Sequence, residues 1–398
     1  MRKVILGIIA EYNPFHNGHA YHIAKARAAC GADLVIAVMS GPFTQRGDAA
    51  ILSPVARAEM AVLSGVDLVF ELPALFAVRE ADAFALGGVS LLTALGCTHI
   101  SFGCETVDLA LLQNAAELIM NPTPTFSSYL HSALEKGCSY AKAQGTALEK
   151  WLHTKALSLP NNVLGLCYMQ AISRLQSPLI PIPVARLGDY HDVSLPKQNA
   201  LPSATALRAA LLAGNWQAVR VMMPESTYPI LQREALAGRI QQPNALDKAL
   251  RLTLINADEN TLNALPGASE GLDKLIIKQR DTFVTRETLV AALKSKRYTY
   301  TRLNRMLTHL LLNISCESFL PAPPYARLLA AKKASLPYLR NIKKSGLQII
   351  EKAARYDKSN PCFISDIRAY DLWALGANLP FGLGFRQSPA IQDLPFHS

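Results

Sequence analysis

The chain of 398 residues is long enough for two or three domains, and half of it is hydrophobic while only 18% is charged, which argues against a largely disordered protein. The net charge is +10, and residues 273–358 hold the whole excess, with 18 Lys and Arg against 6 Asp and Glu. Such a basic segment is typical of a nucleic-acid contact surface, and a solvated basic face is the alternative.

The seven cysteines include no C-x-x-C pair, so we expect reduced thiols rather than a disulfide framework, and no metal site. The N-terminus resembles a signal peptide because basic residues precede an apolar run, but Glu11 interrupts that run and no cleavage site follows. No stretch approaches the length of a membrane span. We therefore expect a cytoplasmic protein without membrane contact, and no segment indicates a protein partner.

Residues 8–23, with the sequence IIAEYNPFHNGHAYHI, follow the pattern of a strand, a tight turn and a helix start. Residues 4–10 form an apolar run rich in β-branched side chains, which predicts a buried parallel strand. The pair Asn13-Pro14 predicts a turn, and the apolar positions from Ala20 onward suit a helix.

A helix start offers unpaired backbone N–H groups and a positive dipole end, which suits phosphate. His16 and His19 can both donate to phosphate oxygens there, and Gly18 between them leaves room for a ligand. The spacing H-x-G-H after a first strand is characteristic of nucleotidylyltransferases and class I synthetases, where the histidines stabilise charge on the α-phosphate.

Strands and helices then alternate, which predicts an α/β fold with a doubly wound parallel sheet. Further strands are expected at 34–39, 66–72, 98–102 and 179–187, with helices at 53–63, where Ser53 is the cap, and at 77–94. Loops at strand ends place ligands in such folds, so Gln45, Arg46, Gly103 and Arg186 are candidate ligand contacts.

Residues 203–208 form a second candidate anion-binding site. Ser203 or Thr205 would cap a new helix, and Arg208 would lie on its first turns. Together with the upstream histidines, Arg208 is a candidate to hold the departing pyrophosphate of an adenylyl transfer.

Strand patterns fade after Trp216, and amphipathic helices follow, the last expected at 366–375. Within the basic segment, KSKRYTYTRLNR interleaves cations with tyrosines, a composition typical of an RNA-binding surface; a solvated helix end with packing tyrosines is the alternative. The candidate RNA contacts are Lys294, Lys296, Arg297, Tyr298, Tyr300, Arg302 and Arg305. We thus expect a nucleotidylyltransferase-like, ATP-binding catalytic domain at 1–215 and a mainly helical, basic, RNA-binding domain at 216–398.

At this point the sequence resembles the bacterial tRNA(Met) cytidine acetate ligases. The resemblance rests on blocks that follow one another along most of the chain: EYNPFHNGHAYHI (11–23), MSGPFTQRGDAAI (39–51), FELP (70–73), FGCE (102–105), PNNVLGL (160–166), RLGDYHD (186–192), SATALR (203–208), SEGL (269–272) and KSKRYTYTRLNRML (294–307). Residues 273–275 and 325–328 and Tyr370 look less typical, and they fall in the expected tRNA-binding half.

The resemblance implies an enzyme that activates acetate with ATP as acetyl-adenylate and then acetylates N4 of the wobble cytidine of elongator tRNA(Met). Mg²⁺ would accompany ATP. The catalytic residues would be His16, His19 and Arg208. The expected ATP contacts are Ile8, Ile9, Ala10, Glu11, Tyr12, Asn13, Pro14, Phe15, His16, Asn17, Gly18, His19, Ala20, Tyr21, Gly103, Asn162, Arg186, Ser203 and Thr205.

Two other functions remain as alternatives. A small-molecule nucleotidylyltransferase would share the N-terminal half but leaves the basic segment unexplained. A non-catalytic RNA-binding protein with a relict nucleotide fold is disfavoured by the intact His16, His19 and Arg208.

Overall fold

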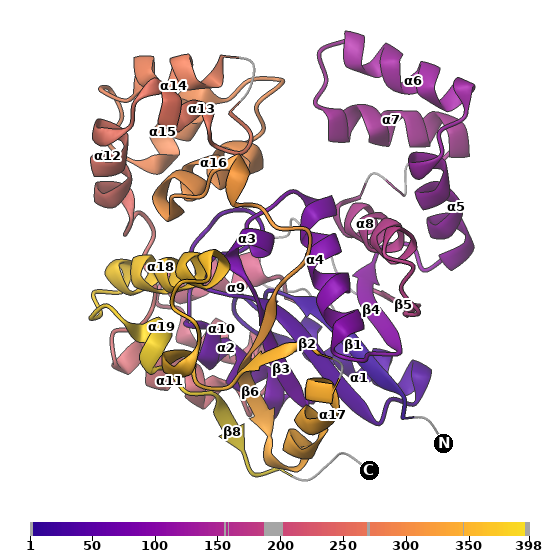
Figure 1. The fold of residues 1–398 in the computed structure, drawn as a ribbon, viewed down its shortest axis with the longest axis vertical. Coiled ribbons are helices and arrows are strands. Elements are labelled where there is room, and N and C mark those ends of the chain that lie inside the picture. Colours follow the sequence, from indigo (N-terminus) through magenta and orange to yellow (C-terminus); the bar gives the residue numbers. More distant parts are fainter. Residues whose placement is uncertain are drawn as a thin grey trace.

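The computed structural model describes residues 3–154, 157, 159–186, 202–268, 271–344 and 346–394, so residues 187–192 and 269–270 of the blocks quoted above lie outside the described chain. In that chain eight strands form one sheet with the order β5-β4-β1-β2-β3-β6-β7, and β8 pairs with β6 (Figure 1). The strands are β1 (Ile5–Ala10), β2 (Leu34–Ser40), β3 (Leu68–Leu72), β4 (His99–Cys104), β5 (Ile180–Ala185), β6 (Tyr325–Lys332), β7 (Gln348–Ile350) and β8 (Ala390–Gln392).

The first five strands are parallel, which confirms the predicted α/β fold. Ile8 of β1 lies opposite Ala37 of β2 and Ser101 of β4, so the carboxyl ends of the central strands meet at one edge of the sheet. This edge, where the strand order reverses around β1, is where open α/β sheets bind ligands.

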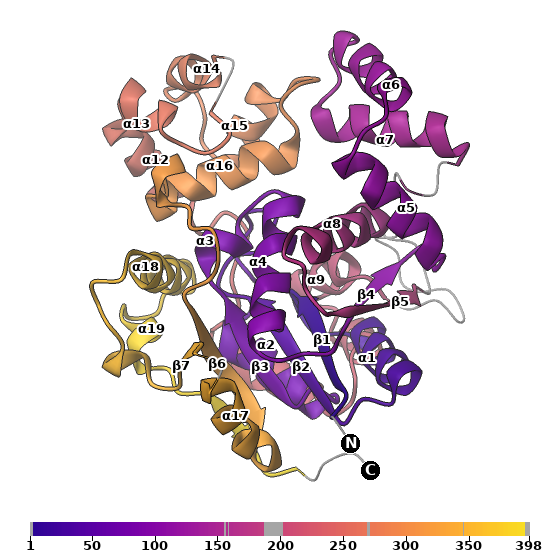
Figure 2. The same cartoon turned by 45° about the vertical axis from the view of Figure 1, so that its right-hand side comes forward.

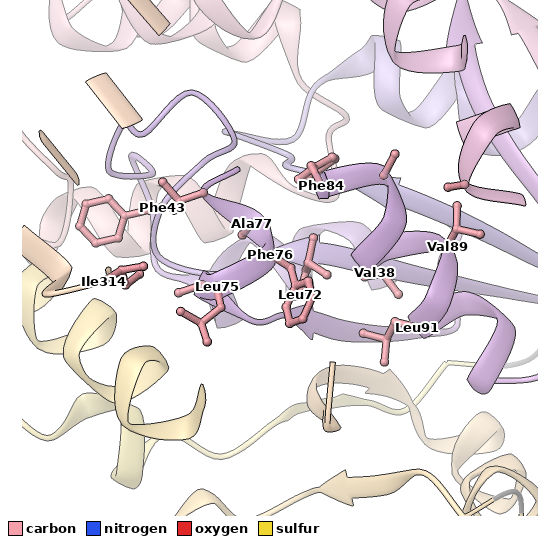
Figure 3. Close-up of a cluster of buried hydrophobic side chains, with 14 of the residues drawn as sticks. Val38, Phe43, Leu72, Leu75, Phe76, Ala77, Phe84, Val89, Leu91 and Ile314 are labelled. Atoms are coloured by element: carbon pink, nitrogen blue, oxygen red, sulfur yellow. The ribbon is translucent and has the colours of Figure 1, made fainter. Parts of the chain in front are cut away.

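Helices cover both faces of the sheet because successive side chains of each buried strand point to opposite sides. One face packs against α1 (Asn17–Cys30), α2 (Pro54–Leu63), α9 (Ala204–Leu212), α10 (Trp216–Met222) and α11 (Tyr228–Leu236). The other packs against α3 (Ala74–Ala77), α4 (Ala81–Ala94), α8 (Pro160–Arg174) and α18 (Pro361–Gly376). Figure 3 shows part of the second core, where Val38 of β2 lies among side chains of α3 and α4.

The strand β6 is a feature that the sequence analysis did not anticipate. It was expected to fall in the helical, tRNA-binding half, but all eight of its residues are buried and it pairs antiparallel with β3. Its sequence YARLLAAK lacks a strand pattern, and Ala, Leu and Lys favour helix. Pairing with β3 along one edge, and with β7 and β8 along the other, therefore overrides local propensity.

Two helical groups stand beyond the edge of the sheet where the parallel strands end (Figures 1 and 2). The first, here called the helical unit, consists of α12 (Asp247–Asn256), α13 (Glu259–Asn263), α14 (Leu272–Gln279), α15 (Arg286–Leu293) and α16 (Tyr300–Leu312). The second consists of α5 (Leu109–Met120), α6 (Pro124–Glu135) and α7 (Tyr140–Leu152). Shorter helices are η2 (Cys316–Ser318), η3 (Lys333–Tyr338), α17 (Leu339–Lys344), η4 (Ala353–Arg355) and α19 (Leu383–Arg386).

The expected division at residue 216 does not follow the sheet. Residues 325–332 return to it as β6, and α18 packs against α3. The helical unit is thus inserted between two parts of the chain that share one core. None of the described helices is long and apolar enough to cross a membrane.

Candidate active site

A cavity of about 360 Å³ lies at the carboxyl ends of β1, β4 and β5 and at the starts of α1 and α9. Its walls include Ile8, Ile9, Ala10, Glu11, Tyr12, Asn13, His16, Gly18, His19, Tyr21, Gly103, Arg186, Ser203, Thr205 and Arg208. The structure therefore brings together, around one cavity, most of the ATP contacts and all three catalytic residues expected from sequence.

His16 and His19 form the start of α1 with their own side chains. The Nδ1 atom of His16 accepts a hydrogen bond from the backbone N–H of Gly18 at 3.0 Å, and Nδ1 of His19 accepts from the N–H of His16 at 3.2 Å. Because each Nδ1 is an acceptor, the proton of each neutral ring is on Nε2. The two rings are stacked with centroids 3.7 Å apart, so each is held as a donor beside the cavity.

Both histidines are neutral at pH 7. Burial, followed by the nearby Arg186 and Arg208, lowers the pKa of His16 to about 3, and burial together with His16 itself holds the pKa of His19 well below its usual value. A bound polyphosphate would oppose these effects because its negative charge favours the protonated ring. The site thus offers two neutral N–H donors to the negative charge that develops in a transition state.

Gly18 lines the cavity and also makes room for the His16 ring. A Cβ atom at residue 18 would lie 2.8 Å from the Cε1 atom of His16. Any side chain there would push the ring out of its capping position.

The turn before α1 is held by Arg208, from the second candidate anion-binding site. Arg208 donates from Nη1 to the carbonyl oxygen of Asn13 at 2.7 Å and from Nη2 to Oγ1 of Thr205 at 3.2 Å. Ser203 caps α9 by accepting from the N–H of Ala206 at 3.0 Å, as predicted. Tyr12 in this turn has a φ of 47°, a strained value for a bulky residue that is typical of functional sites.

Arg57 fixes the ends of β1 and β2 although sequence analysis did not single it out. Its side chain is fully buried and donates to the carbonyl oxygens of Glu11, Ser40, Gly41 and Leu52. Burial lowers its pKa to about 10, so the guanidinium stays charged at neutral pH. Four carbonyl acceptors satisfy this buried cation, which locks the two strand ends next to the cavity.

Arg186 and Asn161 line the side of the cavity formed by β4, β5 and α8. Arg186 donates to Oδ1 of Asn161 at 3.3 Å, and its aliphatic part lies over Gly103, where a Cβ would be 3.2 Å from Cγ of Arg186. The expected contact Asn162 does not line the cavity. Its buried Oδ1 instead accepts from the N–H groups of Glu105 and Thr106, so it holds the turn after β4.

Four other expected ATP contacts do not line the cavity: Pro14, Phe15, Asn17 and Ala20. Phe15 is fully buried in the core below α1, and Asn17 donates to the carbonyl of Val221 on α10. Sequence analysis missed His22, Thr44, Asp48, Asn161 and Tyr168, which do line it. The sequence offered a hint for His22, since it follows His19 by three residues and so continues the same helix face.

The loop after β2 connects the cavity to the helical unit. Thr44, Gln45, Arg46 and Asp48 line the cavity, while the carbonyl of Gly47 accepts from Oγ1 of Thr308 at 2.5 Å and from Nη2 of Arg286 at 3.2 Å. Gly47 has a φ of 89°, and a Cβ there would lie 2.9 Å from the backbone of Arg305. We call this contact the Gly47 clamp; the loop can approach α16 so closely only because residue 47 is glycine.

The candidate RNA-contact residues of the helical unit differ in exposure. Lys294, Lys296, Arg297 and Tyr300 are exposed. Tyr298 is only 8% exposed and packs in the core, which corrects the expectation that its ring could stack on a base. Arg302 donates to the carbonyl of Gly267, and burial lowers the pKa of Arg305.

The basic excess of residues 273–358 is divided between two distant parts of the molecule. Part lies on the helical unit and part around α17, at the opposite end of the molecule (Figures 1 and 2). Arg327 and Lys332 of β6 are buried, and Lys332 pairs with Asp67 at 2.8 Å. The net charge of the segment therefore overstates the charge of any single surface.

Fold and cavity together define a nucleotidyl transferase: the family described as HIGH Nucleotidyl Transferase matches residues 3–381. Among curated proteins, the tRNA(Met) cytidine acetate ligase of Clostridium perfringens is 37% identical over 97% of this chain and 99% of its own length. The one from Bacillus subtilis is 36% identical over 96% of this chain and 94% of its own length. The chain therefore belongs to the tRNA(Met) cytidine acetate ligase family.

Solved structures agree with this assignment. The chain is similar to the crystal structure of apo Thermotoga maritima TmcAL, with a TM-score of 0.89 and 28% identity over 98% of this chain and all of that one. It is also similar to the same protein bound to alpha-thio ATP, with a TM-score of 0.88. ATP is thus the nucleotide that a protein of this fold binds.

Proposed function

We propose that this enzyme uses ATP to convert acetate to acetyl-adenylate and transfers the acetyl group to N4 of the wobble cytidine of elongator tRNA(Met). The observation that carries the first step is the pair of Nε2–H donors of His16 and His19 at a helix start, inside one cavity with Arg208. The names of the curated relatives support the substrates. A tRNA substrate places the enzyme in the cytoplasm.

The first step needs positioning and charge stabilisation rather than a protein nucleophile. A carboxylate oxygen of acetate attacks the α-phosphorus, and the bond to the bridging oxygen of pyrophosphate breaks. His16 and His19 would donate to the α-phosphate oxygens as charge accumulates there. Arg208 and the start of α9 would receive the pyrophosphate. Mg²⁺ would enter with ATP, held mainly by phosphate oxygens and water.

The second step needs an RNA strand to reach the same cavity. The Gly47 clamp joins the helical unit to the loop that lines this cavity. Phosphate and base contacts beside the cavity are supported by four exposed residues of the unit, Lys294, Lys296, Arg297 and Tyr300.

The direct test incubates the protein with ATP, labelled acetate and either total tRNA or elongator tRNA(Met) with an unmodified wobble cytidine. We expect acetate-dependent pyrophosphate release and label in RNA at that one cytidine. The same tRNA with uridine at the wobble position is the matched control and should stay unlabelled. Label confined to a small molecule would instead indicate a metabolite nucleotidylyltransferase, and the absence of any ATP turnover would refute catalysis altogether.

A further inference from the structure

The transfer of acetyl to cytidine requires a proton acceptor. The amino nitrogen of cytosine attacks the acyl carbon of acetyl-adenylate, so that a C–N bond forms, the C–O bond to phosphate breaks and AMP leaves with its electron pair. The nitrogen must lose one proton in this step, because its lone pair is delocalised into the ring and the free amine is not basic. A side chain that accepts this proton must line the same cavity.

The histidines of the H-x-G-H segment are not suited to this task. Their Nδ1 atoms already accept backbone N–H groups, and their Nε2 atoms carry protons. His22 lies further along α1, and its Nε2 hydrogen-bonds to the hydroxyl of Ser101, which itself donates to the carbonyl of Ile182. That arrangement turns His22 toward β4, which carries Gly103, and toward β5, which Arg186 directly follows.

Two carboxylates remain among the described residues that line the cavity, Glu11 and Asp48. Asp48 is exposed on the loop after β2. Glu11 is half-buried at the end of β1, and its Oε1 accepts from the backbone N–H of Gln45 at 2.6 Å. This hydrogen bond fixes the carboxylate between the nucleotide side of the cavity and the loop that the Gly47 clamp joins to the helical unit.

We propose that Glu11 is the catalytic base of acetyl transfer, taking the proton from N4 of cytidine as the C–N bond forms. This inference rests on the proposed function. The base must lie close to both acetyl-adenylate and cytidine. Glu11 can do so because it directly follows β1 and lies five residues before His16, the first catalytic histidine. The loop bonded to Glu11 contacts α16, on the side from which the RNA would enter.

The surroundings of Glu11 suit a base that works near neutral pH. Burial raises its pKa, while the N–H of Gln45 and then Arg46, Arg57 and Arg208 act in the opposite direction and keep the carboxylate available. Tyr168 of α8 also faces it, and burial raises the pKa of that phenol, so Tyr168 stays neutral. A carboxylate with a raised pKa accepts a proton more readily than an exposed one.

The test separates the two half-reactions. Acetate-dependent ATP–pyrophosphate exchange reports adenylation, and single-turnover transfer from preformed acetyl-adenylate to unmodified elongator tRNA(Met) reports the second step. In Glu11→Gln the side-chain oxygen can still accept from Gln45. We expect the ratio of the transfer rate to the exchange rate to fall by about 10² or more, as for removal of a general base. The wild-type transfer rate should rise with pH through the raised pKa of Glu11, and the variant should lack this rise.

Asp48→Asn and His22→Gln, measured in the same two assays, locate the acceptor. The proposal is overturned if one of these two variants loses transfer selectively while the ratio of the transfer rate to the exchange rate is unchanged in Glu11→Gln. Equal losses of both half-reactions in Glu11→Gln also overturn it, since they would indicate a role in ATP binding. If Glu11→Gln fails to fold, a wild-type transfer rate that does not vary with pH refutes the assignment of Glu11 as the catalytic base. A wild-type enzyme that transfers no acetyl group would refute the proposed function instead.

Discussion

His16 combines two functions on one imidazole ring. Its Nδ1 caps α1 through Gly18, and its Nε2 carries the proton that the cavity uses. A change to alanine would remove both, and the loss of a cap alone costs about 1 kcal/mol of stability. Asparagine, a good N-cap residue, separates the two because its side-chain oxygen can replace Nδ1.

We therefore expect His16→Asn to retain most of the thermal stability of the wild type but to lower acetate-dependent adenylation by about 10² or more, the effect of removing one preorganised donor. His19→Ala should lower adenylation by a similar factor. Exchange assays and thermal unfolding of the same preparations measure the two effects. Near wild-type exchange in His16→Asn would show that the ring acts only as a cap.

The buried histidines also predict how stability depends on pH in the absence of ATP. The pKa of His16 is about 3 and that of His22 about 4, both below the value of 6.5 for an exposed histidine. Between these values the unfolded chain binds more protons than the folded one, so the free energy of unfolding decreases as pH falls below 6.5. Urea unfolding from pH 7 to pH 4.5 should show this decrease, and His22→Gln should reduce it; the same slope in both proteins would contradict the assignment.

At the scale of elements, the Gly47 clamp joins the helical unit to the loop that lines the cavity. Arg286 is half-buried and contacts Gly47, Thr308 and Asn304. Phe43 of the same loop lies near Ile314, which follows α16 (Figure 3). The loop that lines the cavity is thereby held from outside the parallel sheet.

Thr308→Val preserves shape but removes the hydroxyl that donates to Gly47. We expect it to lower kcat/KM for ATP–pyrophosphate exchange by about tenfold or more, because small displacements of positioning groups are costly. Thr253→Val is the matched control: its hydroxyl bonds to Ala249 within α12, away from the loop. Equal losses in the two variants would indicate general destabilisation rather than positioning of the loop.

At the scale of the whole molecule, the helical unit stands beyond the edge of the sheet where the parallel strands end, while α17, which carries a second group of basic residues, lies at the opposite end (Figures 1 and 2). We therefore expect the first group to hold an RNA whose base enters the cavity. Because each neutralised phosphate releases condensed counterions, affinity for tRNA should fall steeply with salt concentration.

The triple variant Lys294→Ala, Lys296→Ala, Arg297→Ala should weaken tRNA binding and flatten its salt dependence, with little effect on adenylation, since none of the three lines the cavity. A matched variant, Arg340→Ala, Lys343→Ala, Lys344→Ala, removes the same charge from α17 and should leave the salt dependence unchanged. Binding titrations at several salt concentrations compare them. A larger loss of tRNA affinity in the α17 variant would indicate that the RNA-binding surface lies around α17 instead.

Local patterns in the sequence determined the parallel strands, the capped starts of α2 and α9 and the turn that carries His16 and His19. These features depend on neighbours within a few residues, through apolar periodicity, turn residues and helix capping. Tertiary structure alone decided that residues 325–332 form a buried strand, because pairing with β3 outweighs the helical preference of that segment. It also decided that Asn162 faces a turn, that Tyr298 is buried and that Gly47 meets α16, since each depends on residues distant in the chain.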